Sequence, residues 1–338
     1  MVVEGYALEP LSAEVSAGFS RVTTVVRMYG AGEEGLGEDV SYAAQDQLHL
    51  ARRGAHLPLA GDHTIASLAA RLDGLELHPD PPTWPEQRPY RRWAFESAAL
   101  DLALRQAGRS LAQALGRTPS PPSFVVSLGL GDPPDPDRVQ RWLRRDPSLR
   151  FKLDADPSWD DALVAALAAT GAVPTIDLKG AYPTSRPPDP ALYQRVVQGF
   201  PDAWLEDPAL TDGTRAALAG HEDRLTWDAP IHGVADIDAC EHPPRCINIK
   251  PSRFGPLQKL MDTYDTVAAR GMTAYGGGQF ELGPGRGQVQ CLAALFHPHA
   301  PNDVAPRGYN EDPPPREVPP SPLAAPCAEL GFRGEGDA

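Results

Sequence analysis

The hydrophobic pattern of the chain changes character near residue 123. Before that point, residues 21–29 are β-branched and partly alternate between apolar and polar positions, which predicts a strand. A glycine-rich turn over 30–37 leads into a return strand that begins with the segment 35–38. Apolar residues at helical spacing then predict helices over 42–53, 64–72 and 93–108. The chain therefore begins with a small β-rich unit followed by helices.

From residue 123 onwards, short apolar strands alternate with helices. Strands are predicted over 124–126, 150–153, 175–178, 203–206, 225–228, 246–250 and 273–275. The helices that follow them are predicted over 137–145, 159–170, 190–200, 214–221, 234–241, 257–270 and 288–296. Residues 303–305 could add an eighth strand. This alternation requires a parallel sheet covered by helices, and so many units in one stretch favour a closed (β/α) barrel over an open sheet.

Polar residues recur at the ends of five of these strands, at intervals of 22 to 29 residues: Lys152, Asp177, Glu206, Asp228 and Lys250. That interval is one strand–helix repeat, so the residues return to one rim of the barrel, where barrel enzymes keep their active sites. Three carboxylates gathered there repel one another unless a cation joins them, and hard oxygen ligands suit Mg²⁺. A charged loop is the alternative for any single position, but the shared register argues against it.

The basic residues are strongly biased. Of 31 lysines and arginines, only Lys152, Lys179, Lys250 and Lys259 are lysine. Arginine does not release its proton at accessible pH, whereas a desolvated lysine near a dication can. Chance retention is the alternative for any one of them, but Lys152 and Lys250 stand where proton transfer would need an amine.

Composition narrows the class of protein. The formal net charge of −14 argues against a nucleic-acid partner or an anionic membrane surface, and 41% hydrophobic residues suffice for a packed core. We find no apolar run long enough for a membrane helix and no signal peptide at Met1–Glu4. Four scattered cysteines without CxxC spacing predict reduced thiols. We expect a cytoplasmic protein that acts on a small molecule, and we leave open a homo-oligomer.

The strand ends resemble those of a known family. The segments that carry the likeness are Phe151-Lys152-Leu153, Ile176-Asp177, Trp204-Leu205-Glu206-Asp207-Pro208, Trp227-Asp228 and Ile247-Asn248-Ile249-Lys250-Pro251. They resemble the successive strand ends of the enolase superfamily, in its mandelate racemase and muconate lactonizing group. The nearest branch is muconate-cycloisomerase-like and includes o-succinylbenzoate synthases and dipeptide epimerases. Gly35-Leu36-Gly37-Glu38 resembles the hairpin of that family's capping domain, and the helix around 98–104 resembles its barrel-entry helix.

This resemblance implies a fold and an activity. It implies a (β/α)7β TIM-type barrel over 119–305 and an N-terminal α+β capping domain over 1–118; we expect the Pro-rich tail, 306–338, to pack on the cap. It implies one Mg²⁺ held by Asp177, Glu206 and Asp228, with Lys152 and Lys250 as acid and base on either face of a small carboxylate substrate. The shared step removes the proton α to the carboxylate and gives a metal-stabilised enolate. Racemisation or epimerisation, cycloisomerisation or dehydration can follow, as in an isomerase or a lyase.

Several positions depart from the family pattern. The second-strand Lys-x-Lys motif becomes Arg150-Phe151-Lys152; the alternative register would put Asp154 in the base position, but Asp156-Pro157 then misses the family's turn. Lys179 replaces the usual Asn two residues after Asp177, and we expect it either to bind the substrate or to pair with a neighbouring carboxylate. Ala229 replaces a glutamate, and the Asp-x-Asp of dipeptide epimerases is missing near 302–305, which argues against dipeptides.

Further residues are candidate substrate contacts. The glycine-rich segment after the seventh strand supplies Gln279, Glu281 and Arg286, and Arg150 and Phe19 complete the set, Phe19 at the end of a cap loop expected over 12–20. We interpret His297 and His299 as packing or surface histidines, because no further ligands lie nearby in sequence. A non-catalytic barrel that keeps a metal or ligand site is the alternative function, motivated by Lys179 and Ala229. Retention of both Lys152 and Lys250 argues against it.

Overall fold

A computed structural model provides the coordinates of the chain. It describes residues 1–16, 19–78, 80–182, 187–310, 315–324, 327 and 329–333, and of Val15, Ser16, Phe19 and Asn310 it describes the backbone alone.

The N-terminal part is an antiparallel sheet with helices packed on it. Its strands β2 (Gly5–Ser16), β3 (Phe19–Gly30) and β4 (Glu33–Asp39) pair in that order, and β1 (Val2–Val3) pairs with β5 (Gly61–Asp62). The helices are α1 (Ala44–Arg53), α2 (Ile65–Asp73), α3 (Arg88–Gln106) and α4 (Leu111–Leu115), with a 3₁₀ turn η1 (Pro85–Gln87) before α3.

The prediction of a loop over 12–20 is wrong. Strand β2 continues through Ser16 and β3 begins at Phe19, with Leu11 opposite Thr23 and Ala13 opposite Arg21. Ser12, Ala13, Glu14 and Ser16 each pair with a residue of β3, with a register shift between Glu14 and Ser16, so the ladder covers most of this stretch.

Two glycines allow helix α3 to lie directly on the antiparallel sheet. A Cβ atom on Gly37 would lie 2.0 Å from the Ala94 carbonyl oxygen, and one on Gly35 would lie 2.1 Å from that of Ala98. The Gly35-Leu36-Gly37 motif thus allows β4 to contact the backbone of α3, while Leu36 stays buried. This contact fixes the cap's sheet against a helix that also reaches the second half of the chain.

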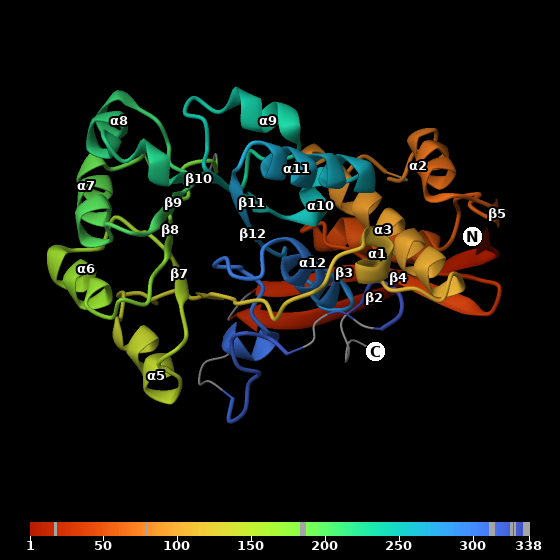
Figure 1. The fold of residues 1–338 in the computed structure, drawn as a ribbon, viewed down its shortest axis with the longest axis horizontal. Helices are drawn as coiled ribbons and strands as arrows, with labels where there is room; N and C mark the ends of the chain where they lie inside the picture. The colour runs from red at the N-terminus through yellow and green to blue at the C-terminus, as the bar shows by residue number, and fades with distance from the viewer. Residues whose placement is uncertain are drawn as a thin grey trace.

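The second half is a curled parallel sheet covered by helices (Figure 1). Its strands are β6 (Val126–Ser127), β7 (Phe151–Asp154), β8 (Thr175–Asp177), β9 (Trp204–Glu206), β10 (Leu225–Trp227), β11 (Cys246–Ile249) and β12 (Thr273–Gly276), each parallel to the next. The helices are α5 (Asp137–Arg145), α6 (Asp161–Ala168), α7 (Pro190–Gly199), α8 (Asp212–Leu218), α9 (Val234–Ala239), α10 (Pro251–Phe254), α11 (Leu257–Ala269) and α12 (Gly285–Phe296), with 3₁₀ turns η2 (Glu222–Arg224) and η3 (Arg307–Asn310).

The seven strand–helix units agree with the alternation in the sequence. Apolar side chains of the strands, such as Ile176 and Leu205, are fully buried beneath the helices. In the part of the chain that the structure describes, we find no helix with both the length and the apolar character needed to cross a bilayer.

A short segment after α12 contacts both edges of the sheet. Asn302 forms a parallel bridge with Phe124, next to β6, and Asp303 forms one with Gly277, at the end of β12. The side chain of Asn302 accepts a hydrogen bond from the Gly276 amide at 2.7 Å and one from His297 Nδ1 at 2.6 Å. His297 is therefore a buried packing residue whose neutral ring holds this segment in place.

The C-terminal tail is joined to α12 by a disulfide that the sequence analysis did not predict. Cys291 of α12 and Cys327 of the tail form a disulfide, so the prediction of four reduced thiols is wrong for this pair. The spacing of 36 residues gave no signal, because the tail returns to α12 only in three dimensions. The Phe332 amide and the Arg333 guanidinium both donate to Asp101 of α3, at 2.7 and 2.6 Å.

We predict that His297 makes the fold sensitive to mild acid. Burial lowers the pKa of the ring to about 4, below the unfolded value of about 6.5. Its stabilising contribution is complete above pH 6.5 and is lost as the pH falls towards 4, with a cost of about 2 kcal/mol at pH 5. Urea unfolding at pH 7.5 and pH 5 should show a smaller pH difference for His297→Gln than for the unmodified chain. His299→Gln, at an exposed position, is the control, and an unchanged difference in His297→Gln would contradict the prediction.

Candidate active site

Three neighbouring strands end in acidic residues that lie side by side. In the parallel register, Asp154 is opposite Asp177, and Asp177 is opposite Glu206. Because parallel strands point the same way, these side chains belong to one end of the sheet. Asp177 and Glu206 are fully buried although each carries a carboxyl group, which requires partners or a cation.

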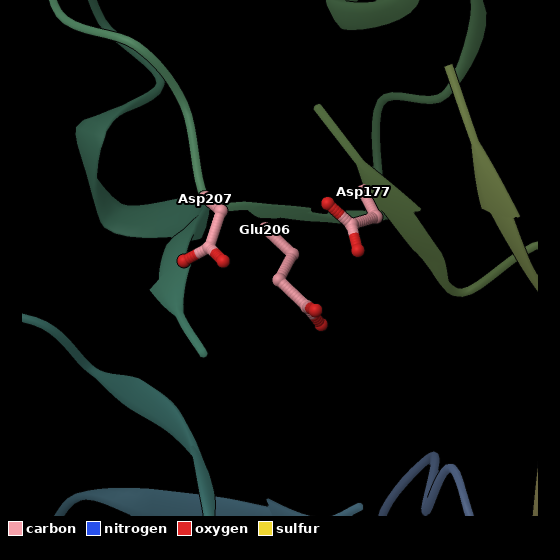
Figure 2. A group of neighbouring side chains, drawn as sticks. All are labelled: Asp177, Glu206 and Asp207. Atoms are coloured by element: carbon pink, nitrogen blue, oxygen red, sulfur yellow. The ribbon is translucent and has the colours of Figure 1, made fainter. Parts of the chain in front are cut away.

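Asp177, Glu206 and Asp207 form a compact carboxylate group (Figure 2). One oxygen from each lies within 4.8 Å of the others. Asp207 follows β9 with a left-handed backbone, φ 48°, and its two oxygens accept the amides of Asp228 and Ala229 at 2.8 and 2.9 Å. Sequence reasoning selected Asp228 and overlooked Asp207, although Asp207 stands directly after Glu206.

Lys152 lies among these carboxylates. Its ammonium contacts Glu206 Oε1, lies 3.5 Å from Asp177 Oδ2 and 3.7 Å from Asp303 Oδ2, and the residue is 2% exposed. Burial would lower the pKa of Lys152, but the charges of Glu206 and Asp177 outweigh it and raise that pKa well above its usual range. Burial also raises the pKa of Glu206 to about 8, against the field of Lys152.

Asp228 lies beside two cations. The Lys250 ammonium is 2.9 Å from Asp228 Oδ2, and the Arg253 guanidinium is 2.9 Å from Oδ1. Burial acts to raise the pKa of Asp228, but Arg253 and Lys250 together hold it below its usual range. The predicted base Lys250 and the predicted ligand Asp228 are therefore in direct contact.

Lys179 contacts Asp177 with both its backbone and its side chain. Its amide donates to Asp177 Oδ1 at 2.9 Å, and its ammonium lies 2.5 Å from Oδ2 and 3.0 Å from Asp154 Oδ1. The left-handed backbone at Lys179, φ 53°, is uncommon for a residue with a side chain. Burial acts to lower the pKa of Lys179, but Asp177 and Asp154 raise it, so the side chain remains a cation.

Some of these groups line a cavity of about 260 Å³, although Asp177, Glu206, Asp207 and Asp228 are not among the described residues of its wall. The predicted residues that share its wall are Lys152, Lys179, Lys250, Gln279 and Arg286. Asp154 and Asp303 add negative charge, and Tyr42, Tyr182 and Phe280 add aromatic surface. A cavity with several cations and an aromatic side suits an organic anion.

The cap and the glycine-rich segment after β12 build one wall of this cavity together. Glu38 accepts the amides of Leu282, Gly283 and Gly285 at 2.6, 3.0 and 2.9 Å. Fully buried Arg21 donates to the Gln279 carbonyl at 3.0 Å. The wall is therefore fixed by side chains more than two hundred residues away in sequence.

The predicted contacts in this segment are partly engaged within the protein. The Gln279 side chain accepts from the Tyr42 hydroxyl at 2.8 Å and donates to Tyr90 at 3.2 Å. Glu281 accepts the Gln279 amide at 2.6 Å and pairs with Arg286 at 3.1 Å. Gln279 and Arg286 line the cavity, whereas Glu281 is buried and is not among the described residues that line it.

The structure does not bring Arg150 to this wall. Arg150 is exposed, and it donates to the carbonyls of Ser148 and Leu149 at 2.9 and 2.8 Å, before β7 begins; it is not among the described residues that line the cavity. Only Phe151 separates it from Lys152, but Arg150 lies before β7 begins, on the side away from the rim. The side chain of Phe19 lies outside the described residues.

The donor set suits a divalent cation. The contacting groups comprise six carboxylates and four basic side chains among the described residues: Asp154, Asp177, Glu206, Asp207, Asp228 and Asp303 with Lys152, Lys179, Lys250 and Arg253. When all are ionised, two negative charges remain in excess, which one dication would neutralise. All the acidic donors are hard oxygens, the preference of Mg²⁺.

Sequence reasoning missed two residues that contact this group and one buried polar residue of β11, Asn248. The Tyr275 hydroxyl donates to Glu206 Oε2, and Arg253 holds Asp228 as described above. Both side-chain polar atoms of Asn248 are buried and lack a hydrogen-bond partner among the described residues. Asn248 stands two residues before Lys250 on β11, so strand alternation was the signal that could have found it.

Two family models match the chain. The C-terminal domain of the family described as Domain of unknown function (DUF8230) matches residues 118–311, and its N-terminal domain matches residues 1–114. The chain belongs to the DUF8230 family.

The resemblance of this DUF8230 member to the enolase superfamily is confirmed. An o-succinylbenzoate synthase of Bacillus subtilis is 28% identical over 225 residues, 64% of this chain and 60% of that protein. An N-succinylamino acid racemase of Thermus thermophilus is 26% identical over 321 residues, 86% of this chain and 81% of that protein.

Solved structures show the same fold. An enolase superfamily member from Listeria innocua aligns with a TM-score of 0.68 at 20% identity, over 98% of this chain and 91% of the other. A dipeptide epimerase from Methylococcus capsulatus, complexed with a Mg ion, aligns with a TM-score of 0.66 at 18% identity, over 90% and 92%. The mixed α/β fold with a curled parallel sheet and a separate antiparallel N-terminal sheet is thus that of the superfamily.

We predict that Tyr275 stabilises the carboxylate group. In Tyr275→Phe, the buried Glu206 carboxyl loses a hydroxyl donor, which should lower the free energy of unfolding by about 1–3 kcal/mol in the presence of EDTA. Urea unfolding monitored by circular dichroism would measure this loss. Tyr29→Phe, at a position 43% exposed, serves as the control and should change stability little. Equal effects in both variants would contradict the role assigned to Tyr275.

Proposed function

We propose that this chain is a Mg²⁺-dependent enzyme that removes the proton α to a substrate carboxylate. The observation that carries the proposal is the pair Lys152 and Lys250, two buried amines that line one cavity and pair with the buried carboxylates Glu206 and Asp228 respectively. We propose further that the curled sheet is a (β/α)7β barrel over 119–305, completed by the segment at Asn302, with a capping domain over 1–118. The tail over 306–338 would then fasten to that cap through Asp101.

Asp177, Glu206 and Asp228 would hold the metal ion. Asp207 would position them, because both its oxygens already accept the backbone amides at the end of β10. A bound Mg²⁺ would supply positive charge beside the substrate carboxylate as the α-carbon loses its proton. The cation also removes the repulsion among the buried carboxylates.

Lys152 and Lys250 would move the proton. They come from β7 and from the end of β11, on either side of the central acidic strands, so one can face each side of a bound α-carbon. One amine removes the α-proton, and the other returns it or stabilises the enolate by charge. Neither role can pass to arginine, because guanidinium does not release its proton.

The substrate would be a small anion with more than one polar group. The cations Lys179 and Arg286 reach the cavity outside the pair of bases, and Phe280 and Tyr182 offer aromatic surface. The relatives are named for o-succinylbenzoate and N-succinylamino acids, and both names describe compounds with a second carboxylate. Racemisation of an N-succinylamino acid and formation of o-succinylbenzoate by dehydration are the two reactions to test first.

A second candidate function is a non-catalytic barrel that binds a metal or ligand. The position of Lys179, which engages both oxygens of Asp177, favours it. The exchange experiment below separates the two, since a binding protein would leave the α-proton of any bound carboxylate in place.

We predict that the two lysines are required for proton exchange. Incubation with N-succinylamino acids in D₂O and Mg²⁺, followed by proton NMR, should show α-deuteration by the unmodified chain. Lys152→Arg and Lys250→Arg keep the charge but should each reduce this rate by about 10²–10⁴-fold. Lys259→Arg, at an exposed position of α11, is the matched control with full exchange. Full exchange in both cavity variants would reduce these lysines to electrostatic roles.

We also predict which carboxylates hold Mg²⁺. In calorimetric titrations, Asp177→Asn, Glu206→Gln and Asp228→Asn should each lose saturable Mg²⁺ binding. Asp207→Asn should retain the site with affinity weakened by about 10–100-fold, as for a residue that orients ligands. Loss in Asp207→Asn together with retention in Asp228→Asn would transfer the third ligand to Asp207.

A further inference from the structure

Lys179 contacts the proposed metal ligand Asp177 from only two residues further along the chain. Its amide and its ammonium take both oxygens of Asp177, at 2.9 and 2.5 Å. Lys179 has a left-handed backbone two residues after Asp177, the last residue of β8. Non-glycine residues rarely keep that conformation, and those that do cluster at functional sites.

The same ammonium has a second carboxylate within reach. Asp154 Oδ1, at the end of the neighbouring strand β7, lies 3.0 Å from Lys179 Nζ. The two Asp residues differ in burial: the Asp177 side chain is 1% exposed, whereas that of Asp154 is 50% exposed. The Lys179 ammonium thus lies between a buried carboxylate at the proposed metal position and a half-exposed one at the rim.

We propose that Lys179 is an internal counter-ion that Mg²⁺ displaces from Asp177, with Asp154 as the carboxylate that receives it. This inference rests on the proposed function, since it requires Mg²⁺ at Asp177. A dication and an ammonium on one carboxylate oxygen repel each other, so metal binding drives the ammonium towards Asp154. The backbone amide of Lys179 can stay on Oδ1 throughout, which keeps Asp177 oriented.

The arrangement has a consequence for the cavity. Lys179 and Asp154 both line it, so the movement of one ammonium changes the charge distribution at the rim when the metal binds. Asp154 acts on metal affinity chiefly through Lys179 in this scheme, and it is not itself a ligand. That indirect action distinguishes the scheme from a simple effect of distant charge.

A double-mutant cycle on Mg²⁺ affinity tests the proposal without any measurement of activity. In calorimetric titration of the full chain with MgCl₂, Lys179→Met should bind about tenfold more tightly, because the competitor is gone. Asp154→Asn should bind about tenfold more weakly, because the ammonium loses its alternative partner. The Asp154→Asn effect should nearly disappear in the Lys179→Met background. Titration of Mn²⁺ followed by electron paramagnetic resonance should reproduce the pattern.

Controls separate this inference from the proposed function. The exposed pair Arg215 and Glu241, 2.8 Å apart, provides matched variants, Arg215→Met and Glu241→Gln, which should leave Mg²⁺ affinity unchanged. Lys179→Gln replaces Lys179→Met if the latter does not fold. An equal loss from Asp154→Asn in both backgrounds, or no gain from removal of Lys179, would overturn the inference while the metal site itself stands. Mg²⁺ binding that persists in Glu206→Gln would instead overturn the proposed site.

Discussion

The burial of several carboxyl groups at one end of a parallel sheet is the constraint on which this molecule depends. Asp177 and Glu206 are carried there by strand register, and neither can leave the interior without unpairing a strand. Their charges must be compensated locally, and Lys152 compensates both. Such an arrangement contributes little to stability, because desolvation of the ions offsets their attraction. Buried charges of this kind, in contact with one another, are typical of functional sites.

The N-terminal antiparallel sheet also helps to build this cavity. The cavity wall formed by the segment after β12 consists of loops that no strand of the parallel sheet could hold in place alone. Buried Glu38 and Arg21, from the antiparallel sheet, satisfy the amides and carbonyls of that segment. Gly35 and Gly37 in turn allow the strand that carries Glu38 to lie against α3. Close backbone packing between β4 and α3 therefore supports the strand whose Glu38 holds one wall of the cavity.

Much of this was predictable from the sequence, for identifiable reasons. Apolar runs of three or four residues located each parallel strand, and the repeat length placed Asp177, Glu206, Lys152 and Lys250 at one rim. The interactions that were missed depend on contacts between distant segments. No local pattern marks the hydroxyl of Tyr275 as a partner of Glu206, or Cys327 as a partner of Cys291. The direction of Arg150 was hidden as well, because backbone carbonyls before β7 compete for its guanidinium.

The connection between Glu38 and the glycine-rich segment has a consequence for recombination among relatives. Residues 38 and 282–285 are far apart in the gene, yet neither can accept a new neighbour independently, since one carboxylate satisfies three amides of the other. A crossover between the two domains would join a cap to a loop that it was not shaped to hold. A chimera that keeps this cavity wall must therefore take residue 38 and residues 282–285 from the same parent. This set of residues spans both halves of the chain.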